Sequence, residues 1–333
     1  MDSGEIVRRY LSGERNFRGA NLRSANLIGA TLIGSDFSRS NFAGASLARA
    51  HLERCFSIES NFNGAFLYGA DLSFVKLVSS QLIEADLTKS NLRGARLEKS
   101  DLKGAKLSGA SLRWVSLYRA NLPGVNLCGA NLDGINLRSA NLEGANLNWT
   151  NLNGARLSGA NLKSAQLNGI QLKGAWMNGL QLNEIDFSGM DLNEVKLSGA
   201  KLVGADLTGS NLHRAQMRFS QLDDANLQKA NLQNSNLRGG RLIRANLMKT
   251  DLREADLRNA DLSYTNLNLA ILAGADLSGA DLRGAYLWGV DLDGANLQNT
   301  DLRGASLRGA ALTGANLKDA ILSGATMPDG SIY

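Results

Sequence analysis

The sequence predicts an all-β fold, a solenoid whose chain winds in square coils of four five-residue units. Two observations lead to this fold class. Every fifth residue from Phe17 to Met327 is Leu, Phe or Met, with the single exception of Ser57. The position two residues earlier is most often small, as at Ala20 and Ala25. A period of five matches neither an α-helix, which repeats every 3.6 residues or so, nor a β-strand, which repeats every two.

Each five-residue unit must therefore turn a corner, with two side chains inward and three outward. Four units close a coil of about 20 residues, and stacked coils lie about 4.8 Å apart, like neighbouring strands. Residues twenty apart then lie above one another and form columns. The narrow interior explains the small residues. Asn or Asp before the large residue can bond the backbone at the corner, and the frequent Gly two residues after it adopts conformations that other residues resist.

This consensus, A-(N/D)-L-x-G, resembles the repeat of the pentapeptide-repeat family over residues 15–327. The resemblance implies a right-handed quadrilateral β-helix. At four units per coil, the solenoid has about sixteen coils. We therefore expect one continuous solenoid rather than two domains.

The two ends of the chain are expected to differ from the repeats. Residues 1–14 are predicted to form an N-terminal capping helix, with the helix itself over residues 2–12 and Gly13 at its C-terminal end. Asp2 is the expected N-cap, with Ser3 as the alternative and Glu5 as capping-box partner. One side of the helix should be apolar, formed by Ile6, Val7, Tyr10 and Leu11. Residues 328–333 are predicted to be a C-terminal turn and tail. A weakly capped last coil would allow either a monomer or an end-to-end dimer.

Both end segments resemble those of cyanobacterial, HetL-like members of the family. The resemblance rests on Gly4-Glu5-Ile6, Arg9-Tyr10, Gly13, Arg15-Asn16-Phe17 and Met327-Pro328-Asp329-Gly330-Ser331-Ile332. It implies a cyanobacterial regulatory protein, with heterocyst or other differentiation signalling as the expected setting.

Two irregularities interrupt the repeat. Ser57 stands between Phe56 and Ile58, which leaves two interpretations: a one-residue slip that turns Phe56 inward, or an exposed pair around a weak core position. From Ile170 to Val195 several small positions hold larger residues. We expect the interior to widen there or the type of corner to change.

The composition argues against chemistry at a catalytic centre. The 333 residues include two His and two Cys, and these lie far apart in the predicted coils. We expect Cys55 and Cys128 to be unpaired and inert. No Gly-rich phosphate loop, metal cluster or pocket is predicted, so we expect no enzyme activity and no cofactor. No apolar stretch reaches the length of a membrane span and no secretory signal is visible, so we expect a soluble, cytoplasmic protein.

The net charge of +5 is unevenly distributed over the four predicted faces. The face that begins with the unit of Phe17 carries more positive charge than the whole chain, and it includes Arg218, Arg238 and Arg258, one coil apart. We call these three arginines the basic strip. We expect this strip to steer an acidic partner, and we do not expect nucleic acid to bind, because interleaved aromatic residues are missing.

Exposed aromatic and apolar residues gather nearer the N-terminus and predict a protein-binding surface. Its members are Phe56, Ile58, Phe66, Tyr68, Phe74, Val78, Trp114 and Tyr118. Tyr286 and Trp288 form a smaller candidate. The sequence thus predicts a non-enzymatic interaction scaffold with a protein partner. The alternative is a DNA mimic that modulates a type II topoisomerase, as some family members do, although no face is strongly acidic.

Overall fold

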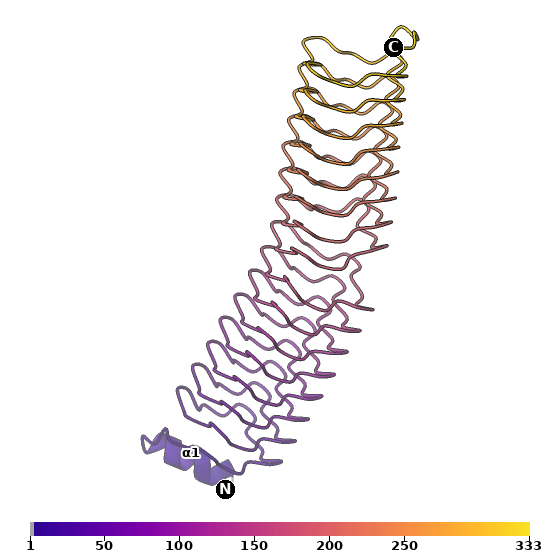
Figure 1. Ribbon diagram of the computed structural model, residues 1–333. Coiled ribbons are helices and arrows are strands. Elements are labelled where there is room, and N and C mark those ends of the chain that lie inside the picture. Colours follow the sequence, from indigo (N-terminus) through magenta and orange to yellow (C-terminus); the bar gives the residue numbers. More distant parts are fainter. Residues whose placement is uncertain (1–2) are drawn as a thin grey trace. The chain divides into compact units, whose positions relative to one another are not determined.

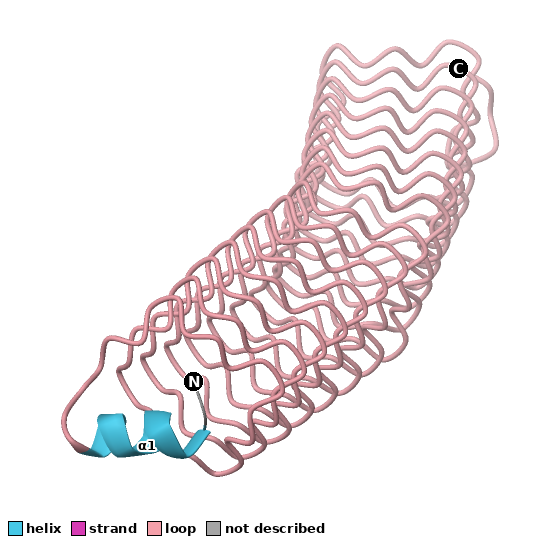
Figure 2. Ribbon diagram, turned by 90° about the horizontal axis from the view of Figure 1, so that it is seen from below, coloured by secondary structure: helices cyan, strands magenta, loops and turns pink. Residues whose placement is uncertain are grey.

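The computed structural model describes residues 3–333 and divides the chain into two compact units, Met1–Leu172 and Lys173–Tyr333. We call them the first and the second unit and describe each by itself. Both consist of stacked coils without long strands, and helix α1 (Ser3–Leu11) lies beside the first coil of the first unit (Figures 1 and 2).

Helix α1 only partly matches the predicted capping helix. Ile6 is fully buried, whereas Leu11 is 77% exposed, so the expected apolar side is wrong for Leu11. The C-terminal end is as predicted: Gly13 has a φ of 99°, and its amide donates to the carbonyl of Tyr10 at 3.0 Å. The expected N-cap, Asp2, lies outside the described residues.

The coils of each unit are joined by parallel bridges between residues twenty apart. In the first unit these bridges run from Asn16 and Asp36 to Asn151 and Gln171. In the second unit they run from Trp176 and Lys196 to Ser306 and Thr326. This spacing confirms, within each unit, the predicted coil of twenty residues.

The corners within residues 17–325 share one backbone feature, a positive φ at the third residue of the turn. At Leu22–Ala25 the amide of Ala25 donates to the carbonyl of Leu22 at 3.1 Å. The third residue, Ser24, has a φ of 55°. Type II turns require a positive φ at this position, which explains why Gly is so common there.

Large inward side chains fill the interior, and most small inward polar groups are hydrogen-bonded. Near the start of the first unit, Phe42 and Phe62 stack with ring centroids 4.6 Å apart. Ser60 Oγ donates to the carbonyl of Phe37 at 2.8 Å, and Cys55 Sγ donates to that of Leu32 at 3.0 Å. These inward groups therefore have backbone acceptors, which favours their burial, whereas the equally buried hydroxyls of Ser35 and Ser235 have no hydrogen-bond partner.

The structure decides between the two interpretations of Ser57. Ser57 is inward and only 3% exposed, while Phe56 points outward and is 38% exposed. The amide of Ser57 donates to the carbonyl of Lys76, in the next coil, at 2.8 Å, as the inward residues of the neighbouring quintets do. A register slip is therefore wrong, and Phe56 and Ile58 flank a weak core position.

The second irregularity, Ile170–Val195, spans the boundary between the two units at Leu172 and Lys173. Within the second unit the corner type does not change, because Glu184 keeps a positive φ of 58°. The turn bonds are long, at 3.3 Å from the Leu180 amide and 3.4 Å from the Ile185 amide. Bulky residues do not all have this effect, since the turn bond from the Val195 amide is 3.1 Å, and that from the small Ser35 is 3.4 Å.

Candidate interaction surfaces

The backbone fixes where each outward side chain of a quintet points. In the quintet around the inward Leu92, Asn91 is the bridging residue, Arg93 the first turn residue and Gly94 the second turn residue. The Asn91 Oδ1 accepts the amide of Arg93 at 3.2 Å, which closes an Asx turn. Asn91 also donates to Asp71, one coil earlier, at 3.2 Å. Outward side chains therefore stand on a rigid, repeating frame.

Two exposed aromatic residues of the first unit occupy the second turn position and cover glycines. Phe74 has a φ of 57° and Trp114 a φ of 59°. A Cβ added to Gly94 would lie 2.6 Å from Phe74 Cε1, and one added to Gly134 would lie 2.7 Å from Trp114 Cδ1. Each ring therefore occupies the space that a side chain of the next coil would need.

Arginines surround the indole of Trp114. The guanidinium carbons of Arg93 and Arg113 lie 4.7 and 4.9 Å from its ring centroid. Arg113 also pairs with Asp133 at 3.2 Å. Phe74 is 49% and Trp114 51% exposed, so both rings remain accessible beside two cations. We call Phe74, Arg93, Arg113 and Trp114 the Trp114 patch.

The residues predicted around Phe56 lie in a different column. Lys76 Nζ is 4.4 Å from the centroid of the Phe56 ring. Further along the same face, Arg119 and Arg138 lie 5.1 and 5.6 Å from the Tyr118 ring. Ile58 and Val78 are half-buried on this face. Cationic side chains thus cover part of the aromatic surface here.

Phe66 and Tyr68 lie in a third column, where their rings stack 6.3 Å apart. In this column a parallel bridge joins Phe66 to Asp86, whereas in the column of Phe56 a parallel bridge joins Phe56 to Lys76. Because two corners separate these quintets, they lie on opposite sides of the coil. The eight predicted residues are therefore spread over three successive columns, and the column of Phe74 and Trp114 lies between those of Phe66 and Phe56.

The basic strip of the second unit is stacked as predicted but is partly neutralised. The amides of Phe219 and Gly239 donate to the carbonyls of Arg238 and Arg258, each one coil on. Arg258 pairs with Asp256 at 2.7 Å and with Asp276 at 3.7 Å. The bond from Arg258 lowers the pKa of Asp256, and the charge of Arg238 adds to the effect. Arg258 is therefore already engaged within the protein.

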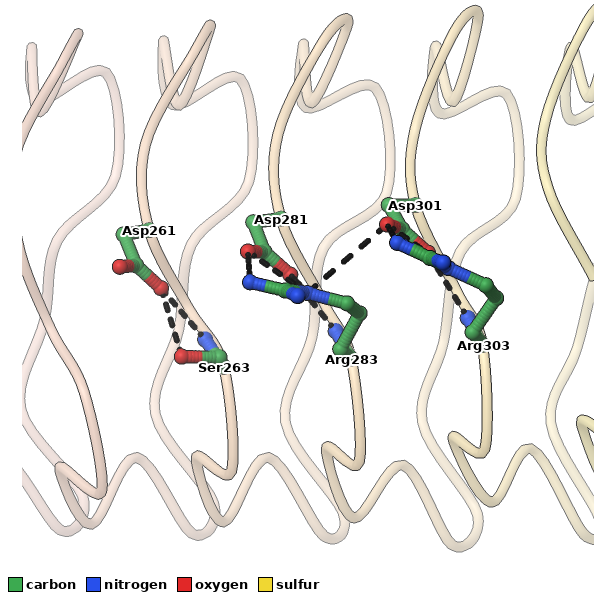
Figure 3. Close-up of polar contacts among 6 residues, drawn as sticks. All are labelled: Asp261, Ser263, Asp281, Arg283, Asp301 and Arg303. Atoms are coloured by element: carbon green, nitrogen blue, oxygen red, sulfur yellow. Dashed lines mark hydrogen bonds and ion pairs between the residues drawn. The ribbon is translucent and has the colours of Figure 1, made fainter.

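A neighbouring column of the second unit carries a ladder of aspartates and arginines (Figure 3). Arg283 pairs with Asp281 at 2.6 Å and reaches Asp301 at 3.8 Å, while Arg303 pairs with Asp301 at 2.6 Å. Each aspartate also accepts the amide two residues on, as predicted for turn chemistry. These carboxylates are held by arginines and backbone, so they do not present a row of unpaired negative charge.

Within residues 3–333 no group of three or more His, Cys, Asp or Glu is arranged to hold a metal ion. Both cysteines are free thiols, as expected. Burial raises the pKa of the Cys55 thiol to about 12, so it is protonated at neutral pH and a poor nucleophile. None of the helices in this part of the chain has the length and apolarity of a membrane span.

The repeat itself decides the family. Residues 16–77, 80–289 and 291–327 match the family model described as pentapeptide repeats (8 copies). This chain belongs to the pentapeptide-repeat family. Proteins of this family form right-handed quadrilateral β-helices.

Solved structures of other pentapeptide-repeat proteins are similar to this chain. HetL, from the cyanobacterium Nostoc sp. strain PCC 7120, is involved in heterocyst differentiation regulation; it is 30% identical over 100% of both chains, with a TM-score of 0.32. Rfr23, from the cyanobacterium Cyanothece 51142, is 28% identical over 51% of this chain and 95% of its own, with a TM-score of 0.20. QnrB1, a plasmid-mediated fluoroquinolone resistance protein, is 23% identical over 55% of this chain and 89% of its own, with a TM-score of 0.35. No curated protein matches the chain.

Sequence reasoning missed several exposed aromatic residues of this pentapeptide-repeat protein. Trp149, Phe219 and Tyr264 are 59% to 69% exposed. Each occupies the second turn position and covers a glycine one coil on, as at Phe219 and Gly239. The signal was present: a bulky residue at the glycine position, followed twenty residues later by Gly. The smaller candidate is also exposed, with Tyr286 at 56% and Trp288 at 52%.

Proposed function

We propose that this pentapeptide-repeat protein is a non-enzymatic interaction scaffold that binds a protein partner through its first unit, with the Trp114 patch as the principal contact. The observation that carries this proposal is a pair of half-exposed aromatic rings held on glycines, with two guanidinium groups beside the indole. Trp and Arg are enriched among residues that dominate binding energy, and rigid placement reduces the entropy lost on binding.

The other predicted residues extend the surface as secondary contacts. Phe56, Ile58, Val78 and Tyr118 would contribute on one face, and the pair Phe66 and Tyr68 on the opposite face. A partner that contacts all of them would have to wrap around the coils. The end segments that resemble HetL-like proteins favour a regulatory role in a cyanobacterium.

The test compares affinity capture by the full chain with capture by a double variant, Phe74→Ser with Trp114→Ser. Serine suits both positions, because Ser79 and Ser139 have a φ of 56° at equivalent turns. The control is Trp149→Ser, which removes a 69% exposed indole at the same turn position of the same unit. We expect proteins that the wild type and the control both retain from the host lysate to be lost by the double variant. Equal capture by all three would contradict the proposal.

The topoisomerase alternative receives no support from the charge distribution. A DNA mimic must present unpaired negative charge along its surface. In the longest aspartate column of the second unit, Asp281 and Asp301 are instead bonded to Arg283 and Arg303, and Asp261 to Ser263 (Figure 3). We therefore do not propose this function.

A further inference from the structure

A second surface combines aromatic and basic side chains, and it lies entirely in the second unit. It consists of Trp176, Lys196, Arg218, Phe219 and Arg238, which we call the Phe219 patch. Trp176 and Lys196 are joined by a parallel bridge. The amide of Phe219 donates to the carbonyl of Arg238 at 3.0 Å. The five residues therefore occupy consecutive coils of one face in regular register.

Phe219 is the exposed apolar centre of this patch. Its φ is 56°, and its ring covers Gly239, where an added Cβ would lie 2.5 Å from Phe219 Cε1. The guanidinium carbon of Arg218 lies 5.5 Å from the ring centroid. Phe219 is 60% and Trp176 47% exposed. The patch thus offers fixed aromatic surface next to cations, which is typical of protein-binding sites.

The charge of the patch is positive. From Trp176 to Gly239, no outward position of this face holds Asp or Glu. The first acidic residues, Asp256 and Asp276, lie farther along and bond Arg258. On the two adjacent faces over the same coils, five carboxylates are matched by five cations: Glu184, Asp191, Glu194, Asp223 and Asp224 against Lys173, Lys201, Arg214, Arg241 and Arg244. Asp223 and Asp224 bond Arg241 and Arg244, each at 2.8 Å. The cations of Lys196, Arg218 and Arg238 therefore exceed the nearby carboxylates and favour an anionic ligand.

The spacing of these cations indicates which kind of ligand fits. Arginines one coil apart repeat at about 4.8 Å, whereas an α-helix repeats at about 5.4 Å per turn. Two carboxylates of an extended strand on one side lie about 6.8 Å apart, a poorer match. Three cations also offer few phosphate contacts, and nucleic-acid binding proteins commonly make about six to ten.

We propose that the Phe219 patch binds an acidic α-helix of a protein partner, with carboxylates one helical turn apart opposite Arg218 and Arg238 and an apolar side chain on Phe219. This site does not use the Trp114 patch, so it stands or fails independently of the contact proposed for the first unit.

The test uses a fluorescein-labelled, alanine-rich helical peptide with glutamates at i, i+4 and i+8 and one leucine between them. Its binding to the full chain is followed by fluorescence anisotropy at low and at physiological salt. A second peptide of the same composition distributes its glutamates around the helix. We expect the first peptide to bind at least about tenfold more tightly, with an affinity that falls as salt rises.

Variants of the chain locate the site. Arg218→Gln with Arg238→Gln should weaken binding about tenfold or more, and Phe219→Ser should weaken it severalfold. The control for the arginines is Arg283→Gln with Arg303→Gln, because these arginines pair with aspartates on another face. The control for Phe219 is Tyr264→Ser, because the Tyr264 ring also covers a glycine. These controls should bind as the wild type does.

A charge swap keeps the proposal testable even if the glutamine variant loses structure. Arg218→Glu with Arg238→Glu should bind the corresponding lysine peptide and lose the glutamate peptide. Equal binding of both glutamate peptides, or equal weakening by the controls, would overturn the proposal. Tighter binding of a single-stranded oligonucleotide than of the helical peptide would overturn it in favour of nucleic acid.

Discussion

At the second turn position of several columns, an exposed aromatic residue is followed one coil on by glycine. In the column of the Trp114 patch, Phe74 is followed by Gly94, Trp114 and Gly134. Both residue types adopt a positive φ here, which costs a non-glycine residue about 1 kcal/mol or more. The ring gains contact over the empty space above glycine. Glycine thus serves two purposes at these positions: it allows the turn, and it makes room for the neighbouring ring.

Gly94→Ala should therefore destabilise the protein more than Gly124→Ala. The φ values are 66° and 65°, so the backbone cost is matched at about 1 kcal/mol. An added Cβ meets nothing within 4 Å at Gly124 but meets the Phe74 ring at Gly94. Displacing that ring should cost about 1 kcal/mol more. Denaturant unfolding followed by circular dichroism measures the difference.

The same pair of glycines supplies the internal control. In the Phe74→Ser background, Gly94→Ala should lower the free energy of unfolding only as much as Gly124→Ala does, because the ring is gone. Indistinguishable losses for the two glycine variants in the presence of Phe74 would show that ring contact plays no part.

At the scale of the element, the quintet joins its neighbours through both backbone and side chains. Asn161 donates to Asn141 at 3.0 Å and Asn141 donates to Asn121 at 3.2 Å, one coil at a time. Where the bridging residue is Asp and the first turn residue is Arg, a fork-like ion pair forms within the quintet, as in Asp301 and Arg303. The ladder in Figure 3 adds a longer contact to the next coil.

Asp301→Asn should lower stability by about 0.2–1 kcal/mol at neutral pH, as expected for an exposed ion pair. The bond from Arg303 lowers the pKa of Asp301. Its stabilisation is therefore present above the unfolded pKa of about 3.9 and is lost as pH falls through the lower folded value. Unfolding free energies of wild type and variant should converge in acid.

A double-mutant cycle with Arg303→Gln isolates the pair. In the Arg303→Gln background, Asp301→Asn should have little effect at any pH. A pH-dependent difference as large as in the wild-type background would assign the stabilisation to the Asx turn and to Arg283, which also reaches Asp301 at 3.8 Å, instead of Arg303.

At the scale of the whole molecule, the five-residue period was sufficient to predict the coil but not the surfaces. Inward positions follow from the sequence because the period leaves no other place for Leu and Ala. The grouping of outward residues needs the column of each quintet, and Phe56 and Phe66 show the consequence: ten residues apart, they lie on opposite sides.

Two features could not be predicted for physical reasons. The spacing of Phe219 and Gly239 is visible in the sequence, but the contact of the ring with the glycine depends on the direction of a side chain at positive φ, which no periodicity reports. The boundary between the two units, at Leu172 and Lys173, falls within the stretch Ile170–Val195. The sequence shows bulky residues at small positions in this stretch, but it does not show how the coils accommodate them.

Cysteine cross-linking tests most directly that residues twenty apart lie in one column. In a chain with Cys55 and Cys128 replaced by serine, Arg218→Cys with Arg238→Cys should form a disulfide under mild oxidation, because coils lie about 4.8 Å apart and a disulfide tolerates Cα separations up to about 7 Å. Arg218→Cys with Gln228→Cys places the thiols half a coil apart and should stay reduced. Ready cross-linking of the second pair, or failure of the first, would contradict the twenty-residue coil.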